Sequence, residues 1–119
     1  MTSQKLENYL RAYRRRSGLN QRELAYLLGC KNGAQVSRYE RRRHMAPLRT
    51  ALAFQAAFGA PVSELYAGTY DSVAKQVRAR AQSLAVQLQT RTPQRGKNLT
   101  PYKLQWLAEH CIPQALRKI

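Results

Sequence analysis

Hydrophobic residues in the first part of the chain recur at helical spacing, in short blocks that end at glycines. The first block holds Leu6, Tyr9, Leu10 and Tyr13. These positions follow the i, i+3, i+4, i+7 pattern of an amphipathic helix, so we expect a helix over Ser3–Ser17. Gly18 stands where that helix should end.

A second block supplies the apolar face of a shorter helix, with Leu24, Leu27 and Leu28. Asn20 precedes it by the spacing of a capping box, in which Glu23 would be the reciprocal partner. Gly29 marks the end of this helix, and a turn follows. A helix of about eight residues is too short to persist without tertiary packing, so it must belong to a larger core.

The third expected helix runs from about Ala34 to Arg42. Val36 and Tyr39 should face the core, and the polar side chains expected to face outward are Gln35, Ser37, Arg38 and Arg41. Hydrogen-bonding and cationic groups with few competing acids favour an anionic surface as the partner of that outer face.

Two more helices complete the first 69 residues. Pro47 suits the first turn of a fourth helix that ends at Gly59, and a short fifth helix is expected over Val62–Tyr66. The apolar residues of the fourth helix are Leu48, Leu52, Phe54 and Phe58. The pattern therefore predicts an all-α fold, with five helices sharing one core in a domain of residues 1–69.

Residues 70–119 read as a helical extension. Asp71 is a good N-cap for a long helix to about Gln89, whose apolar stripe consists of Ala74, Val77, Ala81, Leu84 and Leu88. The stripe fits either a short coiled-coil seam or packing onto the first domain, since it spans only two heptads. Residues 90–98 read as a linker. A last helix should begin at Thr100, with Pro101 in its first turn, and end before Pro113. Its apolar side is formed by Leu104, Leu107, Ala108 and Cys111.

The net charge changes the picture, because 21 Lys and Arg residues against 6 Asp and Glu residues give +15 on 119 residues. Unpaired cations cannot be buried, so the surface must be electropositive and its natural partner is a polyanion such as nucleic acid. A membrane is a poorer partner, since the sequence has neither a long apolar run nor a lipidation motif. We expect a cytoplasmic, nucleoid-associated protein.

The inventory of reactive residues argues against catalysis. The six acids and the two histidines are scattered singly, whereas acid–base and metal sites need clusters of such groups. Cys30 and Cys111 match no metal-ligand or disulfide spacing, so we expect buried, reduced thiols. We predict no enzyme activity, no metal and no cofactor.

One segment resembles a known DNA-binding motif. Residues 19–40 read LNQRELAYLLGCKNGAQVSRYE. This segment resembles the helix-turn-helix of the lambda-type phage repressor and Cro family, also called the xenobiotic-response-element (XRE) family. The matching features are Gln21 at the start of the second helix, Glu23-Leu24-Ala25 within it, Gly29 at the turn and Val36-Ser37-Arg38-Tyr39-Glu40 on the third. With the flanking helices, the resemblance covers residues 6–68.

The resemblance implies that the third helix enters the DNA major groove. The turn between Gly29 and Val36 is one residue longer than is usual in the family, and two of the three family base-reading positions fall on Gly33 and Ala34. We therefore expect base reading to shift to Gln35, Ser37 and Arg38, with Gln21 on a phosphate. The full expected DNA-binding set is Gln21, Arg22, Lys31, Asn32, Gln35, Ser37, Arg38, Arg41 and Arg43.

Two further expectations come from the same resemblance. Arg14 and Glu40 match a structural ion pair of the family. Arg42 stands where a glycine is common, so the third helix either continues or ends in a left-handed residue.

The function that these features favour is a sequence-specific, dimeric transcriptional regulator, a repressor that reads an inverted repeat of double-stranded DNA. Candidate dimerisation residues in the extension are Val77, Leu84, Leu88, Leu104, Trp106 and Leu107. Two alternatives stay open: an antitoxin-like autoregulator whose residues 70–119 bind a partner protein, and an architectural or RNA-binding protein in which charge dominates.

Overall fold

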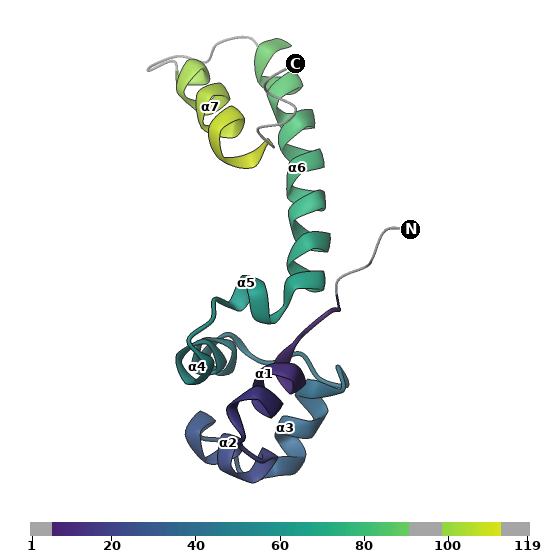
Figure 1. Cartoon of the computed structure of the whole chain (residues 1–119). Coiled ribbons are helices and arrows are strands. Elements are labelled where there is room, and N and C mark those ends of the chain that lie inside the picture. The colour runs from purple at the N-terminus through teal and green to yellow at the C-terminus, as the bar shows by residue number, and fades with distance from the viewer. Residues whose placement is uncertain (1–5, 91–98, 113–119) are drawn as a thin grey trace. The chain divides into compact units, whose positions relative to one another are not determined.

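A computed structural model describes residues 6–90 and 99–112, and this part of the chain is all-helical (Figure 1). The chain divides into two compact units, Met1–Asp71 and Ser72–Ile119. The helices are α1 (Leu10–Ser17), α2 (Gln21–Leu28), α3 (Gly33–Glu40), α4 (Leu48–Phe58), α5 (Val62–Leu65), α6 (Ala67–Thr90) and α7 (Thr100–Trp106), followed by a π-helical turn (Leu107–Cys111). The all-α prediction is confirmed.

The helix ends in the first unit follow local sequence signals. Asn20 and Glu23 form the expected capping box, in which the Asn20 side chain accepts from the Glu23 backbone N–H and the Glu23 carboxylate accepts from the Asn20 N–H. Gly18, Gly29 and Gly59 end α1, α2 and α4 in the left-handed conformation, with φ between 67° and 81°. A side chain would be strained at these three positions, so glycine itself fixes where each helix stops.

The first helix is shorter than predicted. It begins at Leu10 rather than Ser3, and residues 3–5 lie outside the described residues. The backbone of Leu6 accepts from the Gly68 N–H at 2.7 Å, and the Tyr9 N–H donates to the Leu65 carbonyl at 2.6 Å. This segment is non-helical because its backbone hydrogen bonds go to Leu65 of α5 and to Gly68 at the start of α6. Such pairing between distant segments leaves no trace in helical periodicity.

The core of the first unit is built from one or two side chains per helix. Its fully buried large residues are Leu10, Leu24, Val36, Phe54 and Leu65. Leu27 of the predicted α2 stripe is 56% exposed, and the apolar residues Leu48 and Leu52 of α4 are 73% and 49% exposed. Leu24 and Ala25 already fill the buried face of α2, and Ala51 and Phe54 fill that of α4, so the extra leucines fall outside each stripe.

The long helix α6 begins four residues earlier than predicted. Asp71 is therefore inside the helix and not its N-cap, because the Tyr70 N–H already bonds to the Tyr66 carbonyl and the backbone continues from α5. Of the predicted stripe, Ala81 and Leu88 are buried, whereas Val77 and Leu84 are 46% and 39% exposed. Leu88 is therefore buried in the single chain and offers little surface for a dimer contact.

The final helix agrees with its prediction at its start, where Pro101 lies in the first turn. All four residues of its predicted apolar side are half-buried. Trp106 is 61% exposed and stacks on His110, with 3.9 Å between ring centroids. Thr90 is helical, and the rest of the predicted linker, residues 91–98, lies outside the described residues, as does Pro113.

Candidate nucleic-acid interface

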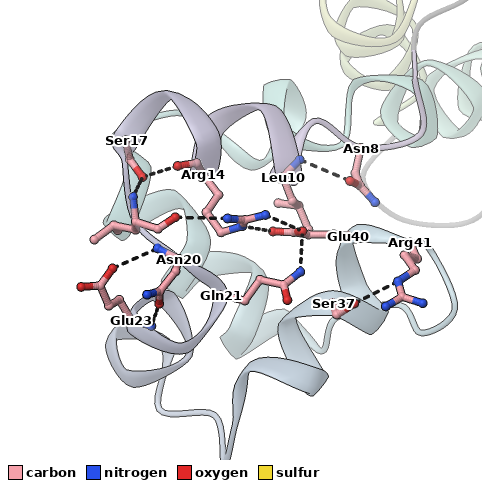
Figure 2. A network of polar contacts seen from close by, with 11 residues as sticks. Asn8, Leu10, Arg14, Ser17, Asn20, Gln21, Glu23, Ser37, Glu40 and Arg41 are labelled. Atoms are coloured by element: carbon pink, nitrogen blue, oxygen red, sulfur yellow. Dashed lines mark hydrogen bonds and ion pairs between the residues drawn. The ribbon is translucent and has the colours of Figure 1, made fainter.

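A buried network of polar side chains joins α1, α2 and α3 (Figure 2). Arg14 Nε donates to Glu40 Oε2 at 2.6 Å, and Arg14 Nη2 donates to Glu40 Oε1 at 3.3 Å. The side chains are only 13% and 2% exposed. Gln21 Nε2 also donates to Glu40 Oε1, at 3.1 Å. The predicted ion pair is confirmed, and its two-point geometry fixes the planes of both groups.

This network also decides the charge of the outer face of α3. Glu40 is the only acid among the residues of α3, and its carboxylate lies inside the network (Figure 2). A buried and fully paired carboxylate contributes little field at the surface. The cations on the outer side of α3 therefore keep their attraction for anions.

The outer side of α3 borders a hollow of about 390 Å³. Its lining residues are Gln21, Ala34, Ser37, Arg38, Arg41 and Arg43. Three are arginines and none is an acid, so the hollow concentrates positive potential. Five of the nine predicted DNA-binding residues meet here, namely Gln21, Ser37, Arg38, Arg41 and Arg43, together with Ala34 at the start of the helix.

Two of the expected base readers use their polar groups in hydrogen bonds within the domain. Ser37 is 7% exposed, and its hydroxyl accepts a hydrogen bond from Arg41 Nε at 2.9 Å (Figure 2). Gln35 is half-buried, and its Nε2 donates to the Tyr39 hydroxyl at 3.1 Å. Ser37 thus lines the hollow as a buried residue, against its prediction as an exposed side chain, whereas Gln35 keeps part of its exposure. Ser37 instead orients Arg41, and Gln35 instead braces Tyr39.

The start of α3 is held against α2. Asn32 caps the helix by accepting from the Gln35 N–H, which gives this predicted DNA-binding residue a structural role. A Cβ added to Gly33 would lie 3.2 Å from the backbone nitrogen of Arg22, closer than most side-chain contacts. Glycine thus permits a close approach of the two helices. Gly33 therefore faces α2 rather than a ligand.

The end of α3 settles the question raised by Arg42. This residue has φ 65° and is the only non-glycine residue with positive φ in the part of the chain that the structure describes. The Arg43 N–H donates to the Arg38 carbonyl and the Arg42 N–H donates to the Tyr39 carbonyl. The helix therefore ends in a left-handed residue and does not continue.

The remaining predicted cations lie outside the hollow. Arg22 and Lys31 are exposed and form no ion pair with another described residue. Tyr26 is 85% exposed on α2, and this exposure was not predicted. Its position outside the leucine stripe was the available signal.

The described residues contain no cluster of three or more His, Cys, Asp or Glu that could hold a metal ion. Cys30 and Cys111 are free and half-buried, and burial raises the pKa of the Cys30 thiol. No helix among the described residues is both long and apolar enough to cross a bilayer.

Comparison with known proteins supports this geometry. A family model described as a helix-turn-helix domain matches residues 8–67, half of the chain. The searches found no curated protein and no solved structure that matches the chain.

Proposed function

Because the chain belongs to this helix-turn-helix family, of the lambda-repressor-like XRE type, and carries its DNA-binding domain, we propose that it is a sequence-specific repressor that reads an inverted repeat as a homodimer. The observation that carries the proposal is the acid-free hollow along α3, with three arginines around Ala34. In this proposal the protein acts in the cytoplasm, where it is bound to the nucleoid.

The burial of Ser37 and the bracing of Gln35 change which side chains read bases. Ala34 and Arg38 are exposed and lie four residues apart, so they share one face of α3. An arginine guanidinium fits the O6 and N7 acceptors of guanine, and an alanine methyl fits the methyl of thymine. We assign base reading to this pair and phosphate contacts to Arg41 and Arg43.

In this assignment the Gln21 side chain contacts both Glu40 and the DNA backbone. One of its amide N–H groups is used by Glu40, which leaves the second for a phosphate oxygen. The network therefore holds the amide in one orientation before DNA arrives, which reduces the entropy lost on binding.

Selection of bound sequences from random duplex DNA tests the proposal. At about 150 mM salt, counterion release already weakens binding that depends on charge alone. We expect an enriched inverted repeat whose half-site centres lie about one helical turn apart. Retained DNA affinity with no enriched sequence would contradict a specific regulator and favour an architectural protein.

The dimer contact is assigned to an exposed stripe on α6. Val73, Val77 and Leu84 are each at least 39% exposed, and their spacings of four and seven residues keep them on one side of a helix. Two copies would bury these side chains against each other. Trp106 is also exposed, whereas Leu104 and Leu107 are half-buried and contribute less surface.

Sedimentation of the full chain tests this contact. The double variant Val77→Glu/Leu84→Glu should be monomeric, because four glutamates would meet in the interface. Val86 is 60% exposed and lies nine residues from Val77, half a turn away around the helix, so Val86→Glu is the matched control and should stay dimeric. A double variant that sediments like the wild type would overturn the assignment.

A further inference from the structure

Two further hollows lie in the first unit and share no lining residue with the α3 hollow. The smaller measures about 100 Å³ and the larger about 320 Å³. They share three lining residues, Glu7, Asn8 and Arg42. The DNA-binding assignment above uses none of these three, so the hollows need an account of their own.

Tyr66 is one of the residues that line the smaller hollow, and its buried hydroxyl has no hydrogen-bond partner among the described residues. The residue is only 8% exposed, so bulk water does not solvate the group freely. Burial raises the pKa of Tyr66 to about 12, which keeps the hydroxyl protonated at neutral pH. A buried donor without an acceptor is unfavourable, so this hydroxyl would gain free energy from an acceptor such as a water or a ligand oxygen.

The charged groups around the hollows favour an anion. Arg42 pairs with Glu7 at 3.4 Å, but both side chains are more than half exposed, so this ion pair is weak and easily displaced. Arg11 and Arg15 line the larger hollow. Its second acid, Glu40, is already neutralised by Arg14. Cations therefore outnumber the available carboxylates.

We propose that the two hollows form one binding site for a small molecule with an oxyanion group, a carboxylate or a phosphate, which accepts hydrogen bonds from the Tyr66 hydroxyl and from the Arg42 guanidinium in place of Glu7. The smaller hollow has room for about three waters, which is the size of such a group. The larger one lies at the lower end of ligand-pocket volumes and takes the rest of the molecule.

Two variants remove one ligand contact each without threatening the fold. Tyr66→Phe deletes only the unpartnered hydroxyl. Arg42→Gly deletes the guanidinium and suits the left-handed backbone at this position. Arg49→Gln is the control, because it removes one exposed charge from α4 and lines neither hollow.

The probes are inorganic phosphate and acetate, each compared with chloride at equal ionic strength by thermal unfolding of the full chain. A ligand at about ten times its Kd should raise the Tm of the wild type and of Arg49→Gln by roughly 5 °C. This rise should vanish in Tyr66→Phe and Arg42→Gly. A response to phosphate alone or to acetate alone would identify the group that the site prefers. Equal responses in all four proteins would reflect general anion effects and would overturn the site.

The regulatory consequence rests on the proposed function. Arg42 directly precedes Arg43, which lines the α3 hollow, so a bound anion adds negative charge beside the DNA contacts. The bound anion should lower the affinity for the operator severalfold. By thermodynamic linkage, bound DNA should lower the affinity for the anion by the same factor. Because Tm is measured without DNA, the site is tested separately from the DNA-binding proposal. Unchanged operator affinity in the presence of a bound anion would overturn the regulatory role alone.

Discussion

Arg14 and Arg38 belong to the same small unit, but their guanidinium groups have opposite surroundings. Arg14 is buried and holds Glu40 through two hydrogen bonds. Arg38 is exposed beside two other arginines in a hollow lined by no acid. The first stabilises the arrangement of α1 and α3, and the second is free to meet an external anion.

The contrast teaches that the placement of a few acids decides what each cation does. In the first unit Glu23 caps α2, Glu40 pairs with Arg14, and Glu64 accepts from the Tyr13 hydroxyl. These contacts hold the fold together and leave α3 with an outer face of one charge sign. Electrostatic attraction for DNA is therefore a consequence of how the fold uses its acids.

The largest effect should come from removing Glu40, the buried partner of Arg14. Glu40→Gln leaves the Arg14 charge buried without a counterion, which should lower the free energy of unfolding by about 3 kcal/mol. Urea denaturation followed by circular dichroism measures it. Glu64→Gln, which loses an exposed hydrogen bond, is the control and should cost under about 1 kcal/mol. Equal losses in the two variants would show that the network does not stabilise the domain.

Replacing Arg38, the exposed arginine, should affect DNA binding and leave stability nearly unchanged. Arg38→Ala should leave the free energy of unfolding within about 0.5 kcal/mol of wild type. Its operator affinity should fall by about 1–3 kcal/mol, because one bidentate base contact is lost. Fluorescence anisotropy with labelled operator measures the affinity, and Arg49→Ala serves as the equal-charge control. A loss of stability as large as that of Glu40→Gln would erase the distinction between the two arginines.

Gln21 connects the two sides, so its replacement should affect both. Gln21→Ala loses the hydrogen bond to Glu40 and the phosphate contact, which should cost about 1 kcal/mol in unfolding and a similar amount in DNA binding. The loss of affinity should be the same for operator and random DNA. A loss confined to the operator would mean that Gln21 reads a base.

Much of this arrangement could be predicted from the sequence because it depends on short-range signals or on the family pattern. The capping box of Asn20 and Glu23 and the left-handed ends at the glycines follow from residue type and spacing alone. The Arg14–Glu40 pair followed from the family resemblance, since nothing local links residues so far apart.

The failures share a different physical cause. Helical periodicity assigned Leu6 and Tyr9 to a helix, but their backbones pair with Leu65 and Gly68, which periodicity cannot register. Ser37 was assigned outward by its polarity, yet its hydroxyl is satisfied by a neighbouring arginine, which removes the penalty of burying it. Sequence patterns report the spacing of side chains, but they do not show which partners satisfy the polar groups.

A smaller effect on stability is expected at Arg42, the left-handed residue that follows α3. Arg42→Gly relieves a left-handed arginine and should raise the free energy of unfolding by up to about 1 kcal/mol. Arg41→Gly is the matched control, because Arg41 has φ −87° and gains nothing from glycine, so stability should fall slightly. Chemical denaturation of the two variants checks the sign. Destabilisation by Arg42→Gly as large as that of Arg41→Gly would show that the Glu7 contact outweighs the strain.

The smallest effect concerns Tyr66, a buried polar group that has no charged partner. Its pKa is raised from 10.0 to about 12, so the folded state holds its proton more tightly than the unfolded state does. The resulting stability is fully present below about pH 10 and is lost as the pH rises through 12. Tyr66→Phe should therefore flatten the fall in stability over this range, as measured by denaturation at several alkaline pH values. An identical fall in wild type and variant would contradict the assignment.

The most direct test of the central claim combines Arg38 with single bases of the selected operator. Wild type and Arg38→Ala are titrated against the operator and against duplexes in which each guanine of a half-site is replaced in turn. The account predicts that one replacement weakens the wild type by about 1–3 kcal/mol and leaves Arg38→Ala unaffected. If Arg38→Ala keeps every base preference of the wild type, the outer face of α3 does not read the sequence through Arg38, and the assignment is contradicted.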